Sequence, residues 1–203
     1  LAERELRRQA WEEPYAAVIV DEAQDLSCAM VRMLHALVGD APDALTLIGD
    51  GQQSIYPGGY TLAEAGISLA GRGVVLDVNY RNTAQILDFA SRLVDGDEFA
   101  DIEGVVGRGD VPQAVSRTGP EPVIERCRNP LERDARMVAR ARAVVREVGT
   151  RPGDVGVLCR SRRAVERAAA ALRADGAPVV LLTDYDGAPS DAIKVGTVKR
   201  AKG

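Results

Sequence analysis

A short apolar run, residues 17–20, leads directly into the carboxylates Asp21 and Glu22. Such a run is typical of a strand buried on both faces, as in a parallel sheet. Ligands of open parallel sheets bind outside the carboxyl ends of the strands, so both carboxylates are expected at a ligand-binding edge. Because successive side chains of a strand point in opposite directions, one carboxylate could hold a metal ion while the other orients or deprotonates water. A strand followed by an acidic turn is the simpler alternative.

A second apolar run, residues 44–48, ends in the sequence GDGQQSIYPGG. Asp50 therefore follows the second predicted strand, with Gln53 and Tyr56 beyond it. The neutral amide of Gln53 can donate and accept hydrogen bonds, so it could contact a phosphate oxygen or position water. A glycine-rich turn without chemistry is the alternative for this segment alone.

Strands alternate with helices along the rest of the chain, which predicts an α/β fold with parallel sheets. Good helix N-caps are Ser27, Thr83, Asn129 and Ser161. Further strands are expected at residues 73–78, 111–115, 122–127, 154–158, 179–182 and 193–198, helices at 1–11 and 61–70, and a loop at 95–109.

The third predicted strand ends in Asn79, Tyr80 and Arg81. An arginine between a strand and a helix can reach a phosphate held by a neighbouring domain, and a surface ion pair is the alternative. The arginines in residues 130–148 could contact a phosphate backbone, but a solvated helix face is the favoured interpretation.

The composition is that of an ordinary globular protein, with 46% hydrophobic and 28% charged residues among 203. No apolar run approaches the roughly 18 residues of a membrane span, so no membrane partner is expected. Three scattered cysteines without metal-ligand spacing favour reduced thiols in a cytoplasm. A net charge of −4 does not indicate nucleic-acid binding, although a local basic stripe would suffice.

Four segments occur in a fixed order: DEAQD at 21–25, GDGQQSIY at 49–56, NYRNTAQIL at 79–87 and GTVKRAKG at 196–203. They resemble motifs II, III, IV and the start of V of UvrD/Rep-like superfamily-one DNA helicases. The resemblance implies a RecA-like P-loop NTPase fold in parts of two domains, with ATP between them. Residues 1–80 would be the C-terminal part of the first RecA-like domain and 81–203 the second domain, with the large insertion domain absent or minimal.

The resemblance also implies residue roles. Asp21 would bind Mg²⁺ and Glu22 would activate the attacking water. Gln53 would contact the γ-phosphate, Tyr80 would stack near the nucleotide base, and Arg81 would act as an arginine finger. The residues implied to bind single-stranded DNA are Tyr56, Thr197, Lys199 and Lys202.

The chain departs from the family pattern in its loops. Gly58 and Gly59 occupy the positions where the family usually has Trp-Arg. Lys199 occupies a position where the family often has His. The sequence contains no GxxxxGK[ST] phosphate loop. We therefore expect a fragment of an ATP-dependent DNA helicase or translocase that is inactive without the missing N-terminal and C-terminal parts of the same protein.

Two other functions fit parts of the pattern. A non-catalytic relative of the helicases could bind DNA or protein without turning over nucleotide. A metal-dependent nuclease could use Asp21, Glu22, Asp25 and Asp50, although no further catalytic base or lysine lies nearby in sequence.

Overall fold

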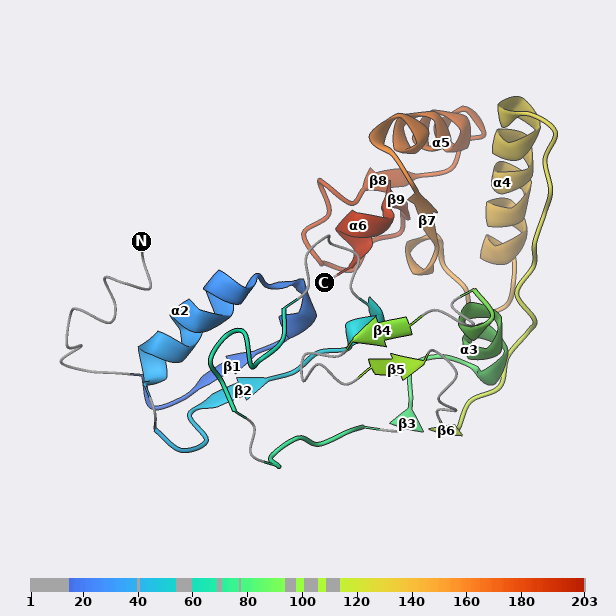
Figure 1. Ribbon diagram of the computed structural model, residues 1–203. Coiled ribbons are helices and arrows are strands. Elements are labelled where there is room, and N and C mark those ends of the chain that lie inside the picture. Colours follow the sequence, from blue (N-terminus) through green and yellow to red (C-terminus); the bar gives the residue numbers. More distant parts are fainter. Residues whose placement is uncertain are drawn as a thin grey trace. The chain divides into compact units, whose positions relative to one another are not determined.

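The computed structural model describes residues 15–39, 41–53, 60–68, 71–76, 78–93, 98–100, 106–108 and 114–202. The chain divides into two compact units, Leu1–Val123 and Ile124–Gly203, and each is described by itself (Figure 1). The predicted helix at residues 1–11 lies outside the described residues. The domain boundary expected between residues 80 and 81 stays a prediction. The two units are defined by contacts in space and need not coincide with those domains.

The described parts contain strands of two to five residues, helices and irregular segments (Figure 1). The strands are β1 (Val18–Val20), β2 (Leu45–Leu47), β3 (Val78–Asn79), β4 (Glu98–Ala100), β5 (Val106–Arg108), β6 (Ala114–Val115), β7 (Gly156–Cys159), β8 (Val179–Leu181) and β9 (Ile193–Thr197). The helices are α2 (Cys28–Val38), α3 (Ala84–Ser91), α4 (Pro130–Val145), α5 (Arg162–Ala174) and α6 (Val198–Ala201), with 3₁₀ turns η1 (Ala23–Asp25), η2 (Gly51–Gln53) and η3 (Pro152–Asp154).

In the first unit, β1 and β2 pair in parallel, with Val18 opposite Leu45 and Val20 opposite Leu47. Helix α2 follows β1 and begins at the predicted cap, where the Ser27 hydroxyl accepts a hydrogen bond from the backbone N–H of Met30. A small core forms beside these elements from Val31, Tyr60, Leu62 and Ala65. The parallel pairing predicted for the first two strands is therefore confirmed.

The predicted burial of β1 on both faces is wrong for the described residues. Val18 and Val20 are half-buried, whereas Ile19 is 72% exposed. Side chains alternate between the faces of a strand, so Ile19 lies on the face opposite the two valines. In the described part of the chain that second face is left uncovered.

Three further expectations for the first unit need correction. Residues 71–76 are exposed and irregular, and the strand there is confined to β3, which pairs in parallel with β6. The loop expected at 95–109 contains an antiparallel hairpin of β4 and β5. Residues 61–66 form a single turn with the predicted Thr61–Glu64 capping box, and Gly66, at φ 75°, ends it.

The second unit is a three-stranded parallel sheet in the order β7-β9-β8, packed against α4 and α5. Its core centres on Leu172 and Val195, which are 1% and 0% exposed. The predicted cap Asn129, followed by Pro130 at the first helical turn, begins α4. The strand expected at residues 122–127 does not form, and Val123 and Ile124 are exposed there. No described helix has the length and apolar character to span a membrane.

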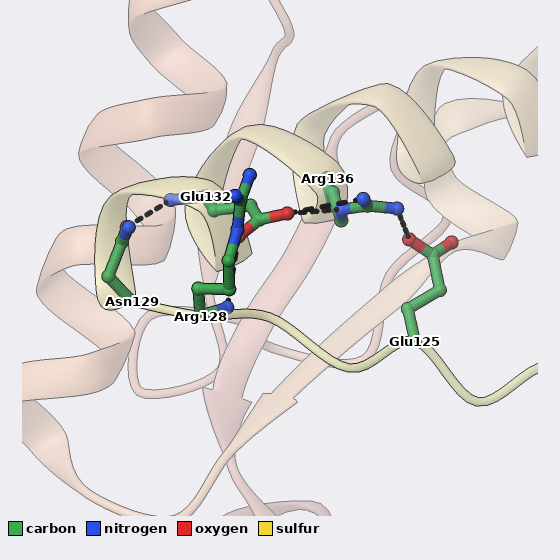
Figure 2. A network of polar contacts seen from close by, with 5 residues as sticks. All are labelled: Glu125, Arg128, Asn129, Glu132 and Arg136. Carbon is green, nitrogen blue, oxygen red and sulfur yellow. Dashed lines mark hydrogen bonds and ion pairs between the residues drawn. The ribbon is translucent and has the colours of Figure 1, made fainter.

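Ion pairs fix the beginning of α4 (Figure 2). The Glu132 carboxylate accepts hydrogen bonds from the backbone and side chain of Arg128 and from Arg136. Arg136 also donates to Glu125, and the Asn129 side chain caps the backbone N–H of Glu132. The bonds from Arg128, followed by those from Arg136, hold the pKa of Glu132 below its ordinary value of 4.5. Arg136 on this helix is thus paired with carboxylates, as the solvated-face interpretation predicts.

The lowered pKa of Glu132 predicts a pH-dependent contribution to stability. Because the folded state favours the charged form, the contribution is present above the ordinary value of 4.5 and is lost as pH falls through the folded pKa. Wild-type protein should therefore exceed Glu132→Gln in unfolding free energy at about pH 6, and the difference should shrink below about pH 4. Urea unfolding at both pH values measures it. Glu166→Gln, an exposed change on α5, is the control, and a pH-independent difference for Glu132→Gln would contradict the prediction.

Candidate functional site

The carboxyl ends of β1 and β2 lie side by side because the two strands are parallel and in register. Hydrogen bonds continue beyond the strands. The backbone N–H of Ile48 donates to the Val20 carbonyl at 2.8 Å, and the N–H of Ala23 donates to the Ile48 carbonyl at 2.9 Å. The turn that carries Asp21 and Glu22 is therefore fixed against the turn that carries Asp50.

The two carboxylates stand on an unusual turn of backbone. Glu22 has φ 53° and ψ 40°, in the left-handed region that few residues other than glycine adopt. Its backbone N–H donates a hydrogen bond to the exposed Asp21 carboxylate at 2.9 Å. Such backbone costs on the order of 1–3 kcal/mol and is often found at functional sites. The left-handed residue directs the chain from β1 straight into η1.

A buried amide joins the two strand ends. The Gln24 side chain is 5% exposed. Its Nε2 donates to the Glu22 carboxylate at 2.5 Å, and its Oε1 accepts from the backbone N–H of Asp50 at 3.1 Å. Asp50 in turn accepts from Nε2 of the exposed Gln53 at 2.9 Å. The structure thus brings Glu22, Asp50 and Gln53 into one hydrogen-bonded chain, with Asp21 beside it.

This set of side chains suits a magnesium ion that is also held by phosphate. Mg²⁺ in phosphate-transferring sites usually takes one or two protein carboxylates, substrate phosphate oxygens and water. Asp21 is exposed and could serve in that way, with Glu22 next to it. Among the described residues no group of three or more His, Cys, Asp or Glu side chains could hold a metal by itself. The nuclease alternative therefore gains no support from the structure.

Tyr80 and Arg81 follow β3 in a turn shaped by Asn79. The Asn79 side-chain oxygen accepts hydrogen bonds from the N–H groups of Arg81 and Asn82 at 3.1 and 3.0 Å. Tyr80 is 72% exposed, and no described carboxylate pairs with the Arg81 guanidinium. The ion-pair alternative for Arg81 is thus not observed in the part of the chain described.

The predicted DNA-binding residues are placed only in part. Tyr56 lies outside the described residues. Thr197 ends β9 and caps α6, where its hydroxyl accepts from the N–H of Arg200 at 3.2 Å. Lys199 is exposed on α6, and Lys202, just after that helix, is half-buried. These three residues belong to the second unit, and their role toward DNA stays a prediction.

Sequence reasoning missed Gln24 and Tyr60. Tyr60 is 6% exposed, and its hydroxyl donates to the Ala23 carbonyl at 3.0 Å. Burial, and to a smaller extent the Cys28 thiol, raise the pKa of this hydroxyl, so it stays protonated as a donor. The only signal in the sequence is the glutamine within DEAQD, whose partner lies 26 residues away.

The Tyr60 hydrogen bond gives a testable contribution to stability. Tyr60→Phe removes one buried hydrogen bond and should lower the free energy of unfolding by about 1 kcal/mol. Tyr80→Phe is the matched control, because that side chain is 72% exposed, and it should change stability by less than about 0.5 kcal/mol. Urea denaturation of both variants measures the effect, and equal stabilities would contradict the assigned bond.

Comparisons with known proteins find similarity to DNA helicases. The UvrD/REP helicase N-terminal domain model matches residues 1–69. The ATP-dependent DNA helicases UvrD2 of Mycobacterium tuberculosis (strains H37Rv and CDC 1551) and of Mycobacterium bovis are 31% identical over 161 residues, or 75% of this chain. The chain spans 22% of the length of these relatives. Both comparisons support a relationship to UvrD-like helicases, carried in part by the segment that holds Asp21, Glu22, Asp50 and Gln53.

Proposed function

We propose that this chain carries part of the ATP-hydrolysing machinery of a DNA helicase or translocase that couples Mg-ATP hydrolysis to movement on single-stranded DNA. The observation that carries the proposal is the joined edge of β1 and β2. There Asp21, Glu22 and Gln53 lie on neighbouring turns, and Gln24 and Asp50 connect them. Similarity to UvrD-type helicases supports the same assignment.

The side chains at this edge suit phosphoryl transfer, which requires positioning and charge neutralisation more than covalent chemistry. Mg²⁺, when bound, would neutralise charge on the phosphates, and Asp21 would hold it. Glu22 would orient and deprotonate the attacking water. The Gln53 amide would contact the γ-phosphate. Its hydrogen bond to Asp50 would couple that contact to the neighbouring strand ends.

Arg81 would complete the site as an arginine finger, and Tyr80 would stack near the base. The exposure of Tyr80 and the absence of a described carboxylate partner for Arg81 leave both side chains available for a ligand. Tyr56, Thr197, Lys199 and Lys202 are proposed to contact single-stranded DNA, by stacking and by phosphate contacts.

The proposed machinery is shared with other parts of a longer protein. The residues 1–80 would complete the first RecA-like domain and 81–203 would form much of the second, with the phosphate loop supplied from elsewhere. The isolated chain should then hydrolyse little or no ATP, because its sequence contains no GxxxxGK[ST] loop to hold the β- and γ-phosphates.

Glu22→Gln tests the base. In the full-length natural protein this substitution keeps side-chain size but removes the proton acceptor, so DNA-stimulated ATP hydrolysis should fall at least about 100-fold while nucleotide binding survives. Turnover with saturating single-stranded DNA and fluorescent-nucleotide binding measure the two properties. Wild-type turnover in this variant would overturn the assignment. Absence of ATP hydrolysis in the natural protein would favour a non-catalytic relative.

Arg81→Ala tests the arginine finger. Removal of a transition-state cation should reduce the hydrolysis rate by about 10³-fold or more. Arg92→Ala is the matched control from the same segment, because Arg92 forms an exposed ion pair with Asp88 and should leave turnover unchanged. Equal rates for both variants would show that Arg81 is a surface residue only.

A further inference from the structure

We propose that the Gln24 carboxamide positions the Glu22 carboxylate and ties it to the strand end that carries Asp50 and Gln53. This inference rests on the proposed function, and it adds a positioning residue that acts through Glu22. Gln24 is the one buried polar residue among those the structure describes, at 5% exposure. A polar side chain is costly to bury unless both of its ends are hydrogen-bonded.

The two hydrogen bonds fix the direction of the amide. A backbone N–H can only donate, so the Gln24 oxygen must face Asp50, at 3.1 Å. The amide nitrogen then faces Glu22, at 2.5 Å, and can only donate to it. A glutamate at this position would keep the acceptor but lose the donor, and a methionine would lose both.

Gly49 provides the space for this arrangement. A Cβ atom on Gly49 would lie 2.6 Å from the Gln24 side-chain oxygen and 3.3 Å from the Gln24 backbone nitrogen. Gly49 does not adopt a left-handed conformation, so close approach of the amide is the physical reason for a glycine. The position of the Gln24 side chain therefore depends on a glycine at position 49.

The arrangement links the two strand ends mechanically. Asp50 is held by Gln24 through its backbone and by Gln53 through its carboxylate. A ligand that moves the Asp50 backbone moves the partner of the Gln24 oxygen, and the amide nitrogen of Gln24 is bonded to Glu22. Glu22 thus receives its orientation from the second strand as well as from its own turn.

The first test compares Gln24→Glu with Gln24→Met in the full-length natural protein. If Gln24 acts through its side-chain N–H donor, both variants should lose about 10-fold or more in kcat for DNA-stimulated ATP hydrolysis. Loss of a hydrogen-bonding partner that orients a functional side chain commonly has an effect of this size. KM for ATP should stay within about threefold, because the loss concerns the chemical step. A simple packing role predicts that Gln24→Glu is the milder change, since it keeps the shape and the Asp50 bond. Near-wild-type kcat in Gln24→Glu would overturn the proposal.

A double-mutant cycle tests whether Gln24 works through Glu22. Glu22→Asp shortens the carboxylate and breaks its contact with the amide. In that background Gln24→Met should cost less than about twofold in further rate, because residues in one network are not additive. Independent, multiplicative losses would overturn the proposal.

Hydrogen exchange of the Asp50 backbone amide tests the link between Gln24 and Asp50 separately from the proposed function, because the measurement needs no ATP turnover. In Gln24→Met and in Gly49→Ala the Asp50 N–H should exchange about 10-fold faster or more, whereas Gln24→Glu should retain protection. Unchanged exchange in both would overturn the linkage itself. Lost protection together with wild-type turnover in Glu22→Gln would instead overturn the proposed function, and with it the positioning role in hydrolysis.

Discussion

The parallel pairing of β1 and β2 determines where the chemistry-bearing side chains of this chain lie. In an antiparallel pair, Asp21 and Asp50 would stand at opposite edges of the sheet. The observed register places Val20 opposite Leu47, so both chains leave the sheet at one edge and in neighbouring turns. Backbone hydrogen bonds beyond the last strand residues then bring Ala23 and Ile48 together. Everything proposed for Asp21, Glu22 and Gln53 depends on that pairing.

The turn after β1 is held from two sides. From within the core, the Tyr60 hydroxyl donates to the Ala23 carbonyl, and from the neighbouring strand end the Gln24 amide joins Glu22 to Asp50. These contacts offset the cost of a left-handed Glu22, which the chain would otherwise avoid. In its proposed role toward water, Glu22 would gain from such fixed geometry, because a positioned group costs no reorganisation during the reaction.

Local signals in the sequence predicted much of this structure. The caps Ser27, Thr83 and Asn129 act within three residues of themselves, so their side chains could be assigned without knowledge of the fold. Apolar runs alone were less reliable: residues 73–78 and 122–127 have strand composition but lack a pairing partner along most of their length in the described part of the chain. The role of Gln24 could not be predicted from the sequence, because its hydrogen bond to Asp50 can be inferred only when the register of β1 and β2 is known.

The most direct measurement is a structure of the full-length natural protein with Mg²⁺ and a non-hydrolysable ATP analogue. The account predicts the ion beside Asp21, directly at about 2.1 Å or through one water, with the γ-phosphate toward Glu22 and Gln53. Gln24 should still bridge Glu22 and the Asp50 N–H in that complex. A nucleotide bound away from the ends of β1 and β2, or an ion without contact to Asp21, would contradict the account.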